Sequence, residues 1–239
     1  ERPDIRVVIF TLAFKKDYFV HHFAGPRIVI EGVSSDSSSR KFATLLMKRL
    51  AKFGVNSDSV RIQRRLKWKR EGKFFYFLAT TVFCKIISSS RWLRTLMRFF
   101  DYHAGWKYRF RRFFENYHPD LVVATDIQNE RDVEMLQNAR YFGIRTVGMV
   151  RSWDNLTTHG LLRVIPDKLM VASPILKDQA MRFNDVPSDR IEMTGIPHYD
   201  KYARGPKITK EEFFQKLGLD ARKPTIFYAT PWRARPSGA

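Results

Sequence analysis

The sequence predicts an α/β fold in which helices cover both faces of a parallel sheet. Three short apolar runs, which do not alternate with polar residues, are typical of strands covered on both sides. Helical spacing of apolar side chains over residues 132–141 separates the first run from the second. Strand, helix and strand in this order indicate parallel strands joined by right-handed crossovers. The runs are residues 121–124, 146–150 and 168–172.

The other elements follow from further apolar runs and from the residues that begin and end helices. Gly54 is placed to end the helix before it, and Thr209 with Glu212 has the spacing of a capping box. Residues 59–73 are very basic and predict either a loop or a further helix. Strands are predicted at 6–10, 27–30, 190–194 and 225–229, and helices at 40–53, 91–117 (interrupted near Gly105), 174–183 and 209–217.

The net charge of +19 over 239 residues is concentrated in one part of the chain. Residues 40–112 carry 20 Lys and Arg against three acidic residues, and the same segment is rich in aromatic side chains. A single cysteine, Cys84, excludes an internal disulfide and a cysteine-cluster metal site. The sequence contains no glycine-rich phosphate loop, no His-Glu-x-x-His and no Asp-x-Asp, so we expect no metal and no cofactor.

Basic residues interleaved with bulky apolar ones, as in residues 40–112, predict a surface that meets anionic lipid. The apolar stretch 74–84 is too short to span a bilayer, which needs about 20 residues. We therefore expect this segment to lie in the membrane interface, where Lys and Arg are attracted to anionic headgroups.

Two alternatives for the same segment stay open at this stage. The apolar residues of 91–100 could form an ordinary core-facing stripe, with Arg91, Arg94 and Arg98 solvated. Alternatively, residues 61–70 could contact nucleic-acid phosphates while Trp68 stacks on bases. The stripe would consist of Trp92, Leu93, Leu96, Met97 and Phe100.

Polar residues follow the predicted strands at the edge where parallel sheets bind ligands. Asp126 follows the first run and could bind a hydroxyl-rich ligand or cap the next helix. Arg151 and Asp154 follow the second run, where Arg151 could pair with a phosphate or with Asp154. Gly160 allows a positive φ or a close backbone approach. The other side chains expected at the mouth of this cleft are Thr157, Thr158 and His159.

Three motifs in the second half of the chain carry a family resemblance. They are His118-Pro119-Asp120-Leu121-Val122-Val123-Ala124, Ser152-Trp153-Asp154-Asn155-Leu156-Thr157-Thr158-His159-Gly160 and Thr194-Gly195-Ile196-Pro197-His198-Tyr199-Asp200. These resemble GT-B sugar transferases of bacterial surface polysaccharides, and also the related UDP-N-acetylglucosamine 2-epimerases and polyol-phosphate transferases. The resemblance implies a Rossmann-like, three-layer α/β/α amino-terminal domain over residues 1–204, with a basic helical insertion near 59–117. Residues 205–239 would be the linker and first strand of a truncated donor-binding domain.

The same resemblance implies metal-independent transfer of a sugar from a nucleotide-sugar to a hydroxyl of a lipid-linked or glycan acceptor. Polyol-phosphate transfer and epimerisation of a nucleotide-sugar are the alternatives within this fold. The chemistry needs a general base, which we expect after the first strand at Asp17, with His21 in reserve. Arg233 would hold the donor phosphate. We expect a peripheral enzyme on the cytoplasmic face of the cell membrane, and no activity from this chain alone because most of the donor half is missing.

Overall fold

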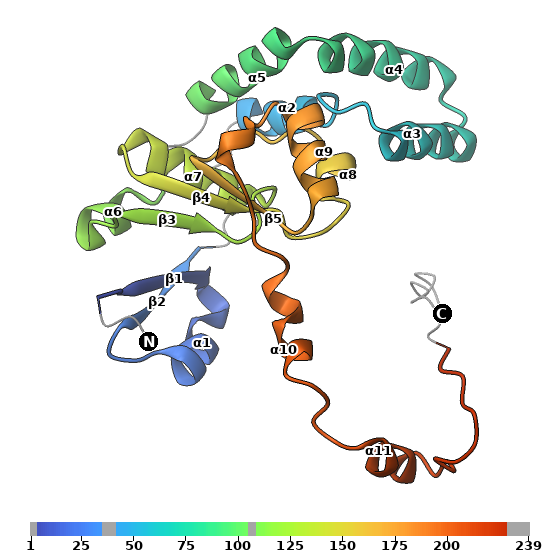
Figure 1. The fold of residues 1–239 in the computed structure, drawn as a ribbon. Coiled ribbons are helices and arrows are strands. Elements are labelled where there is room, and N and C mark those ends of the chain that lie inside the picture. Colours follow the sequence, from blue (N-terminus) through green and yellow to red (C-terminus); the bar gives the residue numbers. More distant parts are fainter. Residues whose placement is uncertain (1–3, 35–41, 105–108, 229–239) are drawn as a thin grey trace. The chain divides into compact units, whose positions relative to one another are not determined.

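The computed structural model describes residues 4–34, 42–104 and 109–228 (Figure 1). The chain divides into two compact units, Glu1–Gly195 and Ile196–Ala239. Every described strand belongs to the first unit. The predicted donor-side residue Arg233 lies outside the described residues.

The larger sheet of the first unit contains four parallel strands in the order β3-β4-β5-β6. Its register pairs Val122 with Thr146 and Gly148 with Leu169. The sequence prediction of parallel strands at the three apolar runs is therefore confirmed. The strands are β3 (Leu121–Ala124), β4 (Arg145–Met149), β5 (Lys168–Val171) and β6 (Ile191–Met193).

A second, two-stranded parallel sheet consists of β1 (Val7–Leu12) and β2 (Ile28–Val33). Among the described residues, the two sheets are not hydrogen-bonded to each other. Aromatic packing joins the smaller sheet to helix α6 (Arg111–Tyr117) and its cap residue Phe110. The ring of Phe10 on β1 meets Phe110 and Phe113 edge to face, with centroid distances of 5.6 and 5.1 Å. Edge-to-face pairs at such distances add to the energy of apolar burial.

Helices connect and cover the strands, and several begin at the polar caps that favour helix initiation. Ser57, Asn129, Ser173 and Thr209 each accept a hydrogen bond from a backbone N–H of the first turn, which satisfies an otherwise unpaired donor. Thr209 and Glu212 form the predicted capping box. The helices of the first unit are α1 (Lys16–Phe23), α2 (Phe42–Ala51), α3 (Asp58–Glu71), α4 (Phe74–Ser89), α5 (Arg91–Ala104), α6 (Arg111–Tyr117), α7 (Glu130–Tyr141), α8 (Asn155–Thr158) and α9 (Pro174–Asn184).

The second unit contains only short helices in its described part. These are α10 (Asp200–Ala203) and α11 (Lys210–Lys216). The strand predicted at 225–229 is wrong for its described residues, because Thr225–Tyr228 have no regular secondary structure. Ile226 and Phe227 are almost fully exposed, and no described strand pairs with this segment. A strand without a partner cannot satisfy its backbone groups or bury its side chains.

The main core of the first unit packs α6, α7 and α9 against β3, β5 and β6. Leu136 on α7 and Leu169 on β5 are completely buried within it. The expected burial of every strand on both faces is wrong for β3, in which buried and exposed residues alternate. Leu121 and Val123 are each 49% exposed. This edge strand therefore has one covered face within the described part of the chain, which is typical of strands at a sheet margin.

Candidate functional site

A pocket of about 900 Å³ opens at the carboxyl ends of β3 and β4. The loop after β3 and the first turn of α7 form one wall, the loop after β4 forms another, and the end of α2 forms a third. Four of the predicted binding residues, Asp126, Arg151, Asp154 and His159, line this single pocket. The remaining lining residues are Lys48, Ala51, Lys52, Ile127, Gln128, Asn129, Glu130, Arg131, Val133, Ser152, Asn155, Leu161 and Arg163.

Asp126 is held in place by hydrogen bonds of both its carboxylate and its backbone N–H. One carboxylate oxygen accepts a hydrogen bond from the backbone N–H of Gln128 at 3.3 Å, and its own N–H donates to Asp132 at 2.8 Å. Arg151 approaches the other carboxylate oxygen at 3.5 Å. The cap of α7 is Asn129 rather than Asp126. Asp126 therefore remains available to a ligand in the pocket, and Arg151 pairs with it rather than with Asp154.

The hydroxyl of Thr158 lies between Asp154 and His159. Ser152 donates to Asp154 Oδ1 at 2.7 Å, and Thr158 Oγ1 lies 3.4 Å from Asp154 Oδ2 and 3.0 Å from His159 Nδ1. The hydrogen bond from Ser152 is the largest influence that holds the pKa of Asp154 below its usual value, although partial burial opposes it. Asp154 is therefore an ionised acceptor at neutral pH, in contact with the residue that orients the imidazole.

Thr157 and Thr158 support the pocket without lining it. Both hydroxyls donate to the backbone carbonyl of Asp154, at 3.0 and 2.8 Å. The carbonyl of Thr157 accepts a hydrogen bond from Ser57 Oγ at 2.5 Å, which attaches α8 to the start of α3. The direct ligand contacts predicted for these two threonines are not among the lining contacts, because their hydroxyls are directed to the helix backbone.

Gly160 has a φ of +90° and packs directly on the end of α2. A Cβ at this position would lie 2.7 Å from the carbonyl oxygen of Ala51 and 2.7 Å from the Cα of Lys52. Both possibilities raised by the sequence, a positive φ and a close approach, are confirmed here. The approaching backbone is that of the chain itself, since the N–H of Leu161 also donates to Ala51 at 2.8 Å.

Replacing Gly160 by Ala should destabilise the first unit by about 2–3 kcal/mol, because a left-handed backbone and a backbone overlap are imposed together. Gly143 is the matched control, with a φ of +70° and open space around it. Gly143→Ala should cost only about 1 kcal/mol. Urea unfolding of both variants measures the difference. An equal decrease in the free energy of unfolding for both variants would show that the end of α2 shifts to accommodate the added methyl group.

A buried ion network forms the floor of the pocket. Arg163 donates to Asp101 at 2.7 and 3.0 Å and to Glu130 at 2.6 Å, and Lys48 pairs with Glu130 at 3.0 Å. Burial acts to raise the pKa of Glu130, but the ion pairs with Arg163 and Lys48 outweigh it and lower that pKa. Gln137 also donates to Asp101 at 2.6 Å. The network stabilises the first turn of α7.

Arg163 was not predicted from the sequence as a site residue. It stands alone between the apolar pairs Leu161-Leu162 and Val164-Ile165, and a lone charge inside an apolar run was the available signal. Such a charge is buried only if it is paired, and its partners come from α5 and α7.

Two buried polar atoms beside the pocket have no hydrogen-bond partner among the described residues. They are the acceptor Gln128 Oε1 and the donor Arg131 Nε, and both residues line the pocket. Buried polar groups are paired in most proteins. Neither atom is exposed in this conformation. A ligand hydroxyl could donate to Gln128 Oε1 and accept from Arg131 Nε once these side chains turn toward the pocket.

The predicted catalytic residues Asp17 and His21 do not line this pocket. Both are exposed residues of α1, and the ring of His21 meets that of His22 edge to face at 4.9 Å. Sequence order placed them after a strand, but that strand belongs to the two-stranded sheet rather than to the sheet that bears the pocket.

No group of three His, Cys, Asp or Glu in the described residues is arranged to hold a metal ion. Within the same residues, no helix has the length and apolar character needed to cross a membrane. Comparison with protein-family models, with curated proteins and with solved structures finds no match to this chain.

Proposed function

We propose that this chain is the acceptor-side domain of a metal-independent glycosyltransferase of the GT-B type, which moves a sugar from a nucleotide-sugar to a hydroxyl acceptor. The observation that carries the proposal is the convergence of Asp126, Arg151, Asp154 and His159 on one pocket at the carboxyl edge of a parallel sheet. Ligands of open α/β sheets bind at this edge.

The lining of the pocket suits a polyhydroxylated ligand that carries a negative charge. Asp126 and Asp154 can accept hydrogen bonds from sugar hydroxyls. If their side chains turn toward the pocket, Gln128 Oε1 can accept and Arg131 Nε can donate further hydrogen bonds. Lys52 and Arg151 are exposed cations at the same pocket, and the first turn of α7 presents the positive end of a helix dipole. A phosphorylated acceptor, such as a lipid-linked glycan, satisfies both requirements.

Within this proposal, His159 is the general base in preference to Asp17 or His21. It is exposed, lines the pocket, and is held at Nδ1 by Thr158, which also contacts Asp154. In the reaction, the imidazole takes the proton of the acceptor hydroxyl, the acceptor oxygen forms a bond to the anomeric carbon, and the nucleotide leaves with the electrons of the broken sugar–phosphate bond.

The proposed enzyme works at the cytoplasmic face of the cell membrane as a peripheral protein. The distribution of charge along the chain supports this part of the proposal. Residues 40–112 carry most of the net positive charge, and Lys and Arg near an anionic leaflet each contribute about 1 kcal/mol to binding. A lipid-linked acceptor would be reached at the same surface.

The test is transfer by the natural-length protein that contains this domain. It is incubated with labelled UDP-, GDP-, dTDP- and CMP-sugars and CDP-polyols in the presence of lipid-linked glycans extracted from bacterial membranes. We expect one nucleotide-sugar to label the lipid fraction, and His159→Ala to lower kcat by about 10²-fold or more. Asp189→Asn, at an exposed aspartate outside the pocket, should leave kcat unchanged.

The other outcomes assign the alternatives. Interconversion of the free nucleotide-sugar without an acceptor would identify an epimerase, and labelling from a CDP-polyol alone would identify a polyol-phosphate transferase. If Asp17→Asn loses activity and His159→Ala retains it, the general base is Asp17 on α1 rather than His159. Salt-sensitive binding of single-stranded RNA, without any transfer activity, would indicate a nucleic-acid-binding protein rather than an enzyme.

A further inference from the structure

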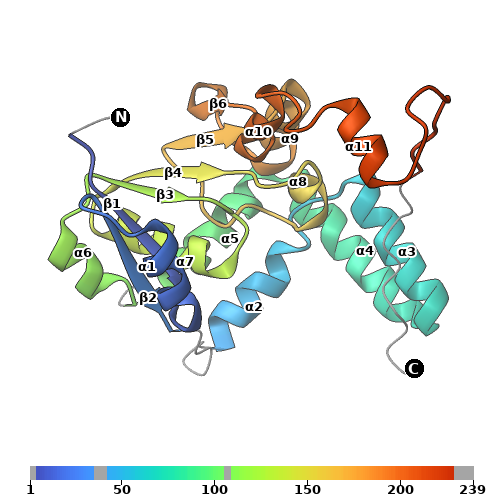
Figure 2. The same ribbon diagram turned by 90° about the horizontal axis from the view of Figure 1, so that it is seen from below.

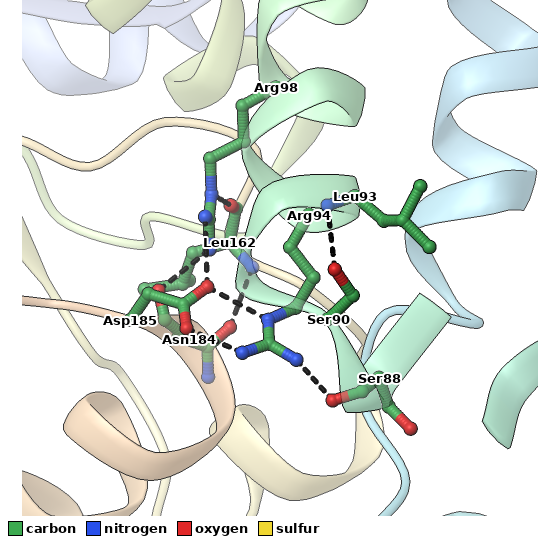
Figure 3. Close-up of polar contacts among 8 residues, drawn as sticks. All are labelled: Ser88, Ser90, Leu93, Arg94, Arg98, Leu162, Asn184 and Asp185. Atoms are coloured by element: carbon green, nitrogen blue, oxygen red, sulfur yellow. Dashed lines mark hydrogen bonds and ion pairs between the residues drawn. The ribbon is translucent and has the colours of Figure 1, made fainter. Parts of the chain in front are cut away.

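Helix α5 is held against the rest of the first unit by the charged residues on one of its faces. Arg94 forms a two-point contact with Asp185, at 2.8 and 2.6 Å, and also donates to the carbonyl of Ser88 (Figure 3). Arg98 donates to the carbonyls of Leu162 and Asn184, at 2.9 and 2.6 Å, and lies 3.2 Å from Asp185. Paired guanidinium groups of this kind are well defined in orientation.

The same face of α5 continues one turn further to Asp101. Asp101 is 2% exposed and is bound by Arg163 and Gln137. Residues 94, 98 and 101 follow helical spacing, so they form one stripe of the helix. The rotation of α5 about its axis is therefore fixed by buried charges, which lose much of their stabilisation if separated.

The aromatic part of the apolar face of α5 is consequently exposed, whereas Leu93, Leu96 and Met97 are half-buried. Trp92, Phe99 and Phe100 are 68%, 54% and 51% exposed. The core-facing stripe that the sequence allowed is wrong for Trp92 and Phe100, which lie outside. The solvated position that it gave Arg94 and Arg98 is also wrong, because both are inward residues. Amphipathic helices of globular proteins normally show the opposite arrangement.

Helix α4 adds a second exposed apolar stripe. It runs end to end with α5 (Figure 1) and packs beside α3 (Figure 2). Its inner side holds Thr80, Cys84 and Ile87. Its outer residues repeat at helical spacing and are each at least 48% exposed: Phe75, Leu78, Val82 and Ile86. Exposed apolar surface of this extent marks a site of interaction.

The charges around these stripes indicate what covers them. In residues 74–104 the single acidic residue is Asp101, which is buried, whereas Lys85 and Arg91 are exposed. The neighbouring helix α3 exposes Arg65, Lys67, Lys69 and Arg70. A second copy of this chain would bring like charges together, which costs energy. An anionic lipid surface offers opposite charge at its headgroups and apolar chains beneath them.

We propose that the outward faces of α4 and α5 insert into the headgroup region of an anionic lipid leaflet, with the cations of α3 on the headgroups. This inference rests on the membrane association in the proposed function and specifies the surface that makes the contact. Its test requires no transfer reaction. Trp92, Phe99 and Phe100 are the anchors on α5, and Phe75 and Ile86 are those on α4. The buried pairs of Arg94 and Arg98 keep α5 in the orientation that presents its anchors.

The experiment measures co-sedimentation of the full chain with phosphatidylcholine vesicles and with vesicles of equal parts phosphatidylcholine and phosphatidylglycerol, across a salt series. We expect binding to the anionic vesicles that weakens with salt. The triple change Trp92→Ser, Phe99→Ser and Phe100→Ser should reduce the partition coefficient by about tenfold or more. Phe14→Ser, which removes a 73%-exposed aromatic outside helices α3 to α5, should leave it unchanged.

A second measurement reports insertion rather than electrostatic attraction alone. Acyl chains brominated near the headgroup should quench the tryptophan fluorescence of the wild-type chain, and Trp92→Phe should remove a measurable part of that quenching. Equal binding of the triple variant and the wild type, or no quenching from Trp92, would overturn the proposal. So would a dimer in sedimentation velocity that the triple variant dissociates, because that outcome assigns the surface to a second copy. Transfer to a water-soluble acceptor analogue would still test the proposed function separately.

Discussion

Asp185→Asn should lower the free energy of unfolding of the first unit by about 3 kcal/mol or more. The substitution keeps the size of the side chain and removes the charge that pairs with Arg94 and Arg98. Both guanidinium groups are largely buried, so they would lose a counter-charge that water cannot replace. Asparagine also tolerates the left-handed backbone of this position, where φ is +56°. The loss therefore reports the ion pairs and not backbone strain.

Urea unfolding measures this loss, and Asp189→Asn, at an exposed site on the same connection, serves as the control. The dependence on pH provides a second readout. Burial acts to raise the pKa of Asp185, but Arg94 and Arg98 outweigh it and lower that pKa below the ordinary 3.8. The stabilisation is thus fully present above about pH 4 and is lost as the pH falls through the lowered pKa. A difference between wild type and variant that persists unchanged in strong acid would contradict this explanation.

Arg163→Met should cost about 3–5 kcal/mol, which makes it the other large effect expected in this chain. Methionine fills a similar space, but Asp101, which is 2% exposed, would lose the one basic partner that it has among the described residues. Within the described part of the chain, Glu130 would retain Lys48 as its ion-pair partner. Either the two carboxylates remain charged without compensation or one of them takes up a proton, and both outcomes destabilise the folded state at neutral pH.

The control for this variant is Arg190→Met, which changes an exposed arginine. Thermal and urea unfolding measure stability, and the double change Arg163→Met with Asp101→Asn tests the coupling. The double variant should be less destabilised than the sum of the two single variants, because the unpaired carboxylate has been removed. Additive losses would mean that Arg163 acts through packing rather than through charge.

The sequence was sufficient to predict the parallel sheet and the edge that bears the pocket. Apolar runs define strands locally, and the rule that parallel strands end at one edge brings Asp126, Asp154 and His159 together. The positive φ of Gly160 was also accessible, because only glycine accepts that backbone freely. These inferences depend on neighbouring residues or on a general property of the sheet.

The remaining features depend on partners distant in the sequence. Helix α5 carries an apolar face and a basic face, and nothing local decides which is buried; Asp185, 91 residues beyond Arg94, decides it. The role of Arg163 likewise required Asp101, 62 residues before it. The local pattern of residues 225–229 favours a strand, but a strand also needs a neighbouring strand to pair with, and the local pattern does not show whether one is present. Asp17 was placed by chain order, which does not specify the sheet to which a strand belongs.

The contact between Asp101 and Arg163 has a mechanical consequence. One end of this ion pair belongs to α5, and the other belongs to the floor of the pocket, which also contacts α7 through Glu130. A rotation of α5 about its axis would therefore displace Arg163 and the part of the pocket that Arg163 contacts. If the aromatic side of α5 inserts into a bilayer as proposed, this ion pair also fixes the orientation of the pocket relative to the lipid surface, and with it the depth from which the proposed lipid-linked acceptor would enter.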